Sequence, residues 1–269
     1  MNRAIVTRCV LLIALLTCFA VPAWAKDFRL ARAEITAEVR QDGSMRVREE
    51  RDFVFNGDFT YAYRVLKLPP GTTVTRLAVG EPGTSYVERP DQSPGTYRVS
   101  RQGNALTVYW YYRASDETRT FVLAYDVAGA VQKHRDVAEL YWQFIGTEWG
   151  AQTNFARVTV NLPGAVQRSD IRAWAHGPLW GNVAIADGRV DLTCKRLPAK
   201  TMVEGRILFP THVILRSARQ DKAAVLASVL AEEGRWAKSA NRRRILFALP
   251  LILAIGGPLV ALVLYLVFG

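Results

Sequence analysis

Hydrophobic and polar residues alternate with a period of two in many short stretches between residues 28 and 209. The segment 35–39 reads Ile-Thr-Ala-Glu-Val, and a second alternating segment runs over 45–55. Between them, the tetrapeptide Gln-Asp-Gly-Ser at 41–44 contains an Asp-Gly pair, which is a strong turn signal. The pattern predicts a β-hairpin over 28–59 with one buried face and one solvated face.

Further alternating segments follow, separated by turns that contain Gly, Pro or Asn. The turns recur about every 8–12 residues, which is the signature of a β-sandwich. No long amphipathic helix interrupts them, and this argues against a parallel α/β sheet. We therefore predict an all-β fold with one or two Ig-like β-sandwich units. The units would be 26–130 and 131–215, with one larger sandwich as the alternative. The additional strands expected are 61–68, 74–79, 97–100, 105–113, 120–127, 139–145, 156–162, 171–175, 183–185, 188–194 and 201–209.

The C-terminal part of the chain has a different pattern. Over 216–244 apolar residues recur at spacings of three and four, which predicts an amphipathic helix beside a membrane. The next segment, 245–268, carries no charged residue and is long enough to cross a bilayer. We expect it to be a single transmembrane helix that continues the amphipathic one.

The first 25 residues have the three parts of a secretory signal peptide. Arg3 and Arg8 precede an apolar stretch, and Ala-Trp-Ala at 23–25 matches the small-x-small pattern of a cleavage site. We expect cleavage between Ala25 and Lys26. Lipidation is a weaker alternative, because Cys18 lies inside the apolar stretch and follows Leu-Leu-Thr rather than a small residue.

The formal charge of +11 changes meaning once it is divided along the chain. Residues 26–215 hold 25 Lys/Arg against 21 Asp/Glu, a balance of only +4, whereas 216–244 hold 8 against 3, or +5. A dense basic segment beside a membrane helix faces lipid headgroups, and Arg242, Arg243 and Arg244 are its membrane-flanking cluster. The lipid bilayer is therefore an expected partner, and nucleic acid is not.

Motifs for catalysis or metal binding are not recognisable in the sequence. His134, His176 and His212 lack partners at metal-ligand spacing. The acidic pairs at 49–50 and 116–117 are interpreted as solvated charges. We expect no cofactor, no metal and no enzyme activity, although a glycosidase needs only two carboxylates placed together in space. With two of the three cysteines in the signal peptide, Cys194 remains, and we interpret it as a core residue.

Aromatic residues are the remaining candidates for a functional role, because exposed rings stack on sugars or anchor protein partners. The run at 109–112 is Tyr-Trp-Tyr-Tyr. Its second and fourth rings share a face with apolar neighbours and are expected in the core. The interaction candidates are therefore Tyr109, Tyr111, Trp149 and Trp180. The first two would face outward or pack against the second unit.

Four stretches resemble the bacterial membrane proteins of the "domain of unknown function 2207" family. They are ITAEVRQDGS at 35–44, ELYWQFIGTEW at 139–149, VTVNLPG at 158–164 and WAKSANRRR at 236–244. The resemblance implies a signal peptide, an extracytoplasmic β-rich domain and a membrane part, but no activity. Family members usually continue with further membrane segments, whereas this sequence stops at Gly269, so we expect a short variant or a truncated form.

Together these observations predict a single-pass protein of the bacterial inner membrane with most of its chain outside the cytoplasm. The hypothesis we favour is a noncatalytic envelope interaction module that binds another envelope protein or itself. The alternative is a protein that binds or cleaves polysaccharide. Outward rings lining a groove with two carboxylates nearby would favour this alternative, and a flat surface with few rings would favour the first hypothesis.

Overall fold

The computed structural model describes the backbone of residues 26–268. Side chains at 247–253, 255–264 and 268 are not described. The expected signal peptide at 1–25, including Ala25 of the cleavage site, lies outside the described residues. Lys26 precedes the first strand.

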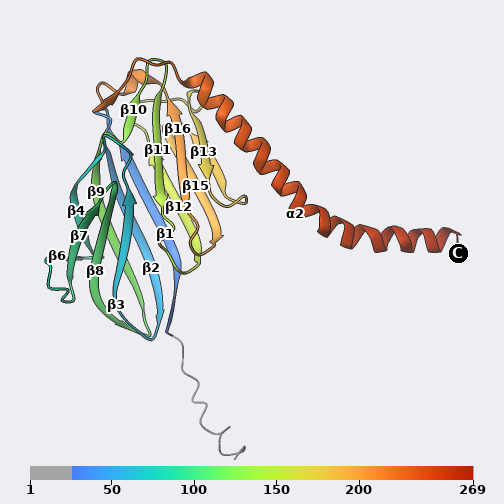
Figure 1. Ribbon diagram of the computed structural model, residues 1–269, viewed down its shortest axis with the longest axis horizontal. Coiled ribbons are helices and arrows are strands. Elements are labelled where there is room, and N and C mark those ends of the chain that lie inside the picture. The colour runs from blue at the N-terminus through green and yellow to red at the C-terminus, as the bar shows by residue number, and fades with distance from the viewer. Residues whose placement is uncertain (1–25, 269) are drawn as a thin grey trace, which may run out of the picture.

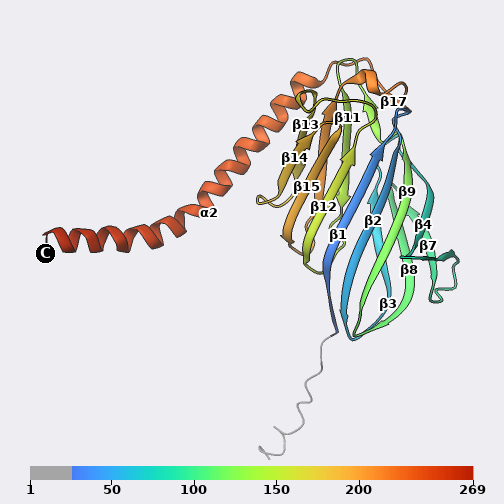
Figure 2. The ribbon, with the colours of Figure 1, turned by 180° about the vertical axis from the view of Figure 1, so that it is seen from behind.

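The largest element is an eight-stranded sheet with the order β14-β15-β12-β1-β2-β9-β4-β5. Figure 2 shows most of these strands side by side. The expected hairpin is confirmed, because β1 and β2 pair antiparallel around the Asp-Gly turn. The strands are β1 (Asp27–Val39), β2 (Met45–Asn56), β4 (Thr73–Glu81), β5 (Thr84–Ser85), β9 (Thr118–Ala128), β12 (Thr153–Asn161), β14 (Asn182–Ala186) and β15 (Arg189–Leu197).

Two smaller sheets lie next to each other on one side of the large sheet (Figure 1). One has the order β3-β8-β7-β6 and the other the order β13-β16-β11-β10-β17. The first consists of β3 (Asp58–Lys67), β6 (Val87–Glu88), β7 (Thr96–Gln102) and β8 (Ala105–Ser115). The second consists of β10 (Val131–Lys133), β11 (Ala138–Ile145), β13 (Arg172–His176), β16 (Val203–Phe209) and β17 (Arg219–Gln220). The 3-10 helices η2 (Arg168–Asp170) and η3 (Thr211–Val213) lie in connecting segments.

One hydrophobic core fills the space between the layers. Alternate residues of the large sheet are buried, among them Ile35, Val47 and Val158, and they belong to the same cluster as Trp110 and Phe144 of the smaller sheets. Strands from both sides of the expected boundary at residue 130 therefore share the large sheet and one core. The all-β class is confirmed, and its Ig-like character stays a prediction.

The pairing of β1 with β12 joins the two expected units. These strands are parallel neighbours with Ile35 opposite Val158, and β12 pairs on its other side with β15. Hydrophobic alternation shows which face of a strand is buried but not which strand lies beside it. The boundary placed at 130/131 consequently divides the large sheet, although the four-stranded sheet lies wholly before it and the five-stranded sheet wholly after it.

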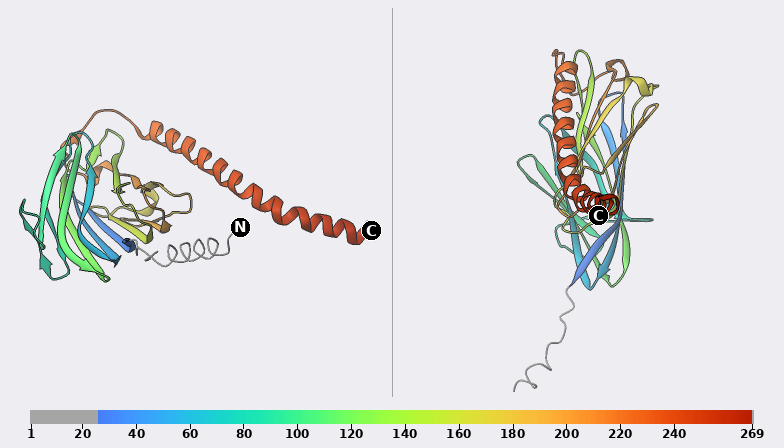
Figure 3. Two further views of the ribbon diagram at one scale, coloured as in Figure 1. Left: turned by 60° about the horizontal axis from the view of Figure 1, so that its bottom comes forward. Right: turned by 90° about the vertical axis from the view of Figure 1, so that its right-hand side faces the viewer.

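The long helix α2 (Leu226–Phe268) leaves the β-layers and projects away from them (Figure 3). It begins at Leu226 rather than at residue 216, because Arg219 and Gln220 form β17 beside β10. In the part of the chain that the structure describes, no helix has the length and hydropathy needed to cross a bilayer. Most side chains of the expected span at 245–268 lie outside the described residues, and that span stays a prediction.

Candidate interaction site and helix attachment

Four tyrosines form two cross-strand pairs on the outer face of the four-stranded sheet. Tyr61 lies opposite Tyr111 and Tyr63 opposite Tyr109, with ring centroids 6.3 Å and 5.8 Å apart. Tyr61 is 54% exposed and Tyr63 is 38% exposed, whereas Tyr111 is covered by its neighbours. The strand period of two turns Trp110 and Tyr112 into the core, where both are buried as predicted.

Arg98 of β7 completes this surface, which we call the tyrosine face (Tyr61, Tyr63, Tyr109, Tyr111 and Arg98). Its guanidinium carbon lies 4.0 Å from the centroid of the Tyr109 ring, and its Nε donates a 2.7 Å hydrogen bond to the Tyr111 hydroxyl. This hydrogen bond raises the pKa of Arg98. Among the described residues no carboxylate forms an ion pair with Arg98, so its charge is held in place by rings alone.

An aromatic cleft of about 260 Å³ lies beside the edge strand β3, next to the tyrosine face. Glu148 is its one acidic lining residue, and Oε1 of Glu148 accepts hydrogen bonds from Arg64 Nη1 at 2.7 Å and from the Val65 amide at 3.2 Å. At the entrance, Lys26 Nζ lies 4.4 Å from the centroid of the Phe59 ring. The other lining residues include Phe28, Phe53, Phe55, Tyr61, Tyr63, Tyr112 and Trp149.

The structure brings only two of the four predicted interaction aromatics together. Tyr109 and Tyr111 share the tyrosine face. Trp149 is only 6% exposed and packs on Phe53, so it is a core residue that lines the cleft, not the surface anchor we expected. Trp180 is 59% exposed in the β13–β14 connection, outside the tyrosine face, and donates from Nε1 to the Lys195 carbonyl at 2.9 Å.

A buried ionic cluster behind the tyrosine face was missed by sequence reasoning. Glu49 was interpreted as a solvated charge, and this was wrong, because Glu49, Arg51 and Arg64 are at most 1% exposed. Arg51 Nη2 donates to Glu49 at 2.5 Å, and Arg64 Nε lies 3.3 Å from both Glu49 oxygens. The signal was present in β2, where Glu49 and Arg51 occupy the same alternating positions as Val47 and Phe53.

Arg64 is the central residue of this cluster, because it connects all three sheets. From β3 it reaches Glu49 of the large sheet, and its Nη2 donates to the Phe144 carbonyl of β11 at 2.7 Å. Burial alone would raise the pKa of Glu49, but Arg64 and Arg51 outweigh this and lower it. Burial and the nearby Glu49 raise the pKa of Tyr125, whose hydroxyl donates to Glu49 at 2.8 Å. The cluster is therefore ionised, and its ion pairs and hydrogen bonds hold the two small sheets against the large one.

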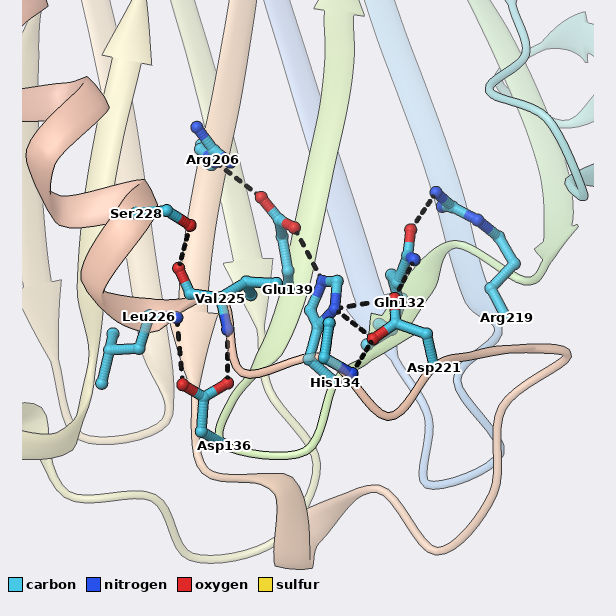
Figure 4. Close-up of polar contacts among 12 residues, drawn as sticks. Gln132, His134, Asp136, Glu139, Arg206, Arg219, Asp221, Val225, Leu226 and Ser228 are labelled. Carbon is cyan, nitrogen blue, oxygen red and sulfur yellow. Dashed lines mark hydrogen bonds and ion pairs between the residues drawn. The ribbon is translucent and has the colours of Figure 1, made fainter.

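A second polar network attaches the start of α2 to the five-stranded sheet (Figure 4). Asp136 accepts hydrogen bonds from the amides of Val225 and Leu226 at 2.9 Å and 3.1 Å, which fixes the first turn of the helix. Burial opposes ionisation of Asp136, yet these two amides lower its pKa. The helix start is therefore tied to the β10–β11 turn.

Arg206 of β16 joins the sheet to the helix through ion pairs. Its guanidinium contacts Glu139 of β11 at 2.6 Å, Glu232 at 2.7 Å and Glu233 at 3.1 Å, the last two on α2. The other Glu139 oxygen faces His134 Nε2 at 3.1 Å, as Figure 4 shows. Burial would lower the pKa of Arg206, but its three carboxylate partners raise it.

A groove of about 380 Å³ lies between α2 and the edge strands β13 and β14. Cys194 lines it and is 5% exposed, which confirms its expected place in the core, and burial raises its pKa. At the far end of the groove Arg244 donates to the Leu179 carbonyl, with Nε at 3.1 Å. Its neighbours Arg242 and Arg243 are exposed.

Acidic and histidine side chains are the groups that could bind a metal ion or transfer a proton in a reaction. Within the described residues no group of three His, Cys, Asp or Glu side chains could hold a metal ion. His134 lies between two carboxylates, Glu139 and Asp221, with Nδ1 3.0 Å from Asp221. Both contacts belong to the helix attachment, not to the cleft.

Comparison with known proteins identifies the family. The model of the family described as "Predicted membrane protein (DUF2207) N-terminal domain" matches residues 29–209. The chain belongs to this family. The matched range contains the tyrosine face, the buried ionic cluster and Arg206, so these features lie in the family domain, whereas α2 follows it.

No curated protein matches the chain. Among solved structures, an M1 zinc metallopeptidase from Deinococcus radiodurans is 14% identical with a TM-score of 0.33, and the alignment covers 68% of this chain and 42% of that chain. A candidate nutrient binding protein from Legionella pneumophila is 13% identical with a TM-score of 0.42, covering 67% and 66%. The chain thus matches less than half of the peptidase, and these distant likenesses carry no functional argument.

Proposed function

We propose that the chain is a noncatalytic interaction module of a bacterial envelope, anchored in the inner membrane by 245–268, with its β-region outside the cytoplasm. The observation that carries this proposal is the attachment of α2. Arg206 and Asp136 tie the helix start to the five-stranded sheet, and the helix then continues without a break toward the apolar segment. A helix held in this way positions the β-region relative to the membrane.

The tyrosine face supplies the binding surface that such a module needs. It belongs to a different sheet from the one that carries α2. Exposed tyrosines offer large contact areas at a low cost in conformational entropy. A partner bound there would leave the helix attachment undisturbed. The partner proposed is another envelope component, and a second copy of this chain is a distinguishable result of the experiment below.

The cleft favours binding over cleavage for the polysaccharide alternative. Outward-facing rings line the aromatic cleft, but Glu148 is the one acidic residue that lines it. Arg64 and the Val65 amide already occupy Oε1 of Glu148. A glycosidase needs two carboxylates on opposite sides of the scissile bond. The arrangement therefore supports recognition without hydrolysis.

Photocrosslinking in the native membrane tests the proposal. A photoreactive phenylalanine analogue would replace Tyr63, and in a matched control it would replace Thr36, an exposed outward residue of β1 on the large sheet. We expect a discrete crosslinked species from position 63 and none from position 36. Equal labelling from both positions, or none from position 63, would contradict the proposal.

A further inference from the structure

We propose that the tyrosine face binds an anionic polysaccharide, such as a polymer of uronic acid sugars. This inference rests on the function proposed above and specifies its ligand. The first observation is the set of rings. Tyr61 and Tyr63 project from an edge strand, and both also line the aromatic cleft, so the face continues around β3 into a hollow. Pyranose rings present C–H bonds that pack against aromatic faces.

The geometry of the strands suits an extended polymer. The Tyr61–Tyr111 and Tyr63–Tyr109 pairs are two residues apart along β3, which places the two rows roughly 6.6 Å apart. The exposed rings of Tyr61 and Tyr63 therefore offer aromatic surface at successive outward positions of β3, on which consecutive sugar units would pack. The cleft beside β3 leaves room for a substituent of a sugar that lies over Tyr61 or Tyr63.

The charged residues on this face of the sheet favour an anionic polymer as the ligand. The outward positions of β3 from Tyr61 to Lys67, and those facing them on β8 and β7, contain no acidic residue, whereas Arg98 and Lys67 are cations. On the outer face of the large sheet several arginines are paired with acids, for example Arg32 with Asp52 at 2.7 Å and Arg189 with Asp191 at 2.8 Å, although Arg157 lies over the Phe155 ring instead. Arg98 is oriented by two tyrosines and remains available for a ligand carboxylate.

The remaining outward residues favour a hydroxyl-rich ligand over a protein surface. Beyond the tyrosines, toward the Gln102 end of β7, the outward side chains carry hydroxyl groups and one amide. Such groups form hydrogen bonds with sugar hydroxyls. The centre of a protein interface is usually apolar, and this face has a valine only at its margins, at Val65 and Val87. The polar positions are Ser100, Gln102 and Thr107, whereas Thr96 is 5% exposed and its hydroxyl donates to the Ser93 carbonyl.

Binding would be measured by titration calorimetry on the full chain in nanodiscs. The probes are oligogalacturonate as the anionic glycan, dextran oligomers as the neutral glycan, and polyglutamate as an acidic peptide. We expect oligogalacturonate to bind more tightly than either of the others. Arg98→Gln should raise its Kd roughly tenfold or more and reduce its dependence on salt. The double change Tyr61→Ala and Tyr63→Ala should raise the Kd similarly.

Arg101→Gln is the matched control, because Arg101 lies on the same strand and its side chain points to the opposite side of the sheet. It should leave the Kd unchanged, and melting curves should show that all variants are folded. Equal binding of polyglutamate, an equal effect of Arg101→Gln, or no binding of oligogalacturonate would overturn the inference. If photocrosslinking at position 63 then captured a protein, the ligand assignment would fail while the proposed interaction function would stand.

Discussion

Replacing Arg64 with Met should destabilise the β-region severely, because methionine matches much of the volume of arginine but cannot donate hydrogen bonds. The change removes the donor groups that contact Glu49, Glu148 and the Phe144 carbonyl, all in the interior. Breaking a buried ion pair by removing one partner typically costs about 3–5 kcal/mol. For a domain of this size, that loss corresponds to a fall in Tm of about 6–20 °C.

The pH dependence separates this explanation from a simple packing defect. In the native protein the pKa of Glu49 is lower than in the unfolded chain. Glu49 therefore stabilises the fold above its unfolded pKa of about 4.3, and this stabilisation is lost as the pH falls through the lower folded value. In Arg64→Met, Glu49 would keep Arg51 but lose the charge of Arg64, and protonation of Glu49 in acid would relieve part of that cost. The difference in stability between variant and native protein should consequently be largest near neutral pH and shrink in acid.

Urea denaturation followed by tryptophan fluorescence at pH 7 and pH 4 would measure both effects. The matched control is Arg48→Met, which changes an outward-facing arginine of β2 that is half-exposed and pairs with Glu50 on the same strand. Exposed ion pairs contribute about 0–1 kcal/mol, so this variant should differ little from the native protein. The reasoning is refuted if Arg64→Met loses less than about 1 kcal/mol, or if its deficit is the same at both pH values.

Four further predictions concern export, redox state, topology and the helix attachment. N-terminal sequencing of the membrane fraction should begin Lys-Asp-Phe, and an intact Met1 would show an uncleaved anchor. The β-region should melt at the same temperature with and without reductant, because Cys194 is buried and free; a large fall on reduction would reveal a disulfide between two copies. Protease added to spheroplasts should digest the β-region while a reporter fused after Gly269 is active only in the cytoplasm, and the reverse pattern would mean that the arginines at 242–244 set the orientation. Arg206→Met should speed amide hydrogen exchange at the start of α2 by leaving Glu233 buried without its cation, whereas Arg172→Met, at an exposed position of β13, should not.

Local features of the fold were predictable from the sequence, and long-range pairings were not. The β1–β2 hairpin and the inward positions of Trp110 and Tyr112 follow from the period of two, because alternation determines the face of a strand. The parallel pairing of β1 with β12 leaves no local signal. Neither does the start of α2, which depends on Asp136, a residue far away in the sequence.

The candidate site was predictable to a similar extent. Tyr109 and Tyr111 were identified from the alternation of β8, but their partners on β3 and the position of Arg98 depend on which strands are neighbours. Trp149 was misplaced because it lies in the loop after β11, where no periodicity indicates burial. Glu49 shows the converse failure, since its position indicated burial and its charge argued against it. The pairing that resolves this conflict comes from Arg64, fifteen residues away.

The parallel pairing of β1 with β12 has a consequence for the order in which the sheet assembles during folding. Residues that face each other across this pair are separated by 123 positions, as Glu38 and Asn161 are. The β1–β2 hairpin can close as soon as both of its strands are free to fold, but the other edge of β1 stays open until β12 is also available. An unpaired strand edge is a template for aggregation, and contacts between distant segments form slowly. The folding chain therefore passes through an interval in which a chaperone that covers open strand edges would protect it. Any translation product that ends before Thr153 would lack β12 and keep that edge open permanently.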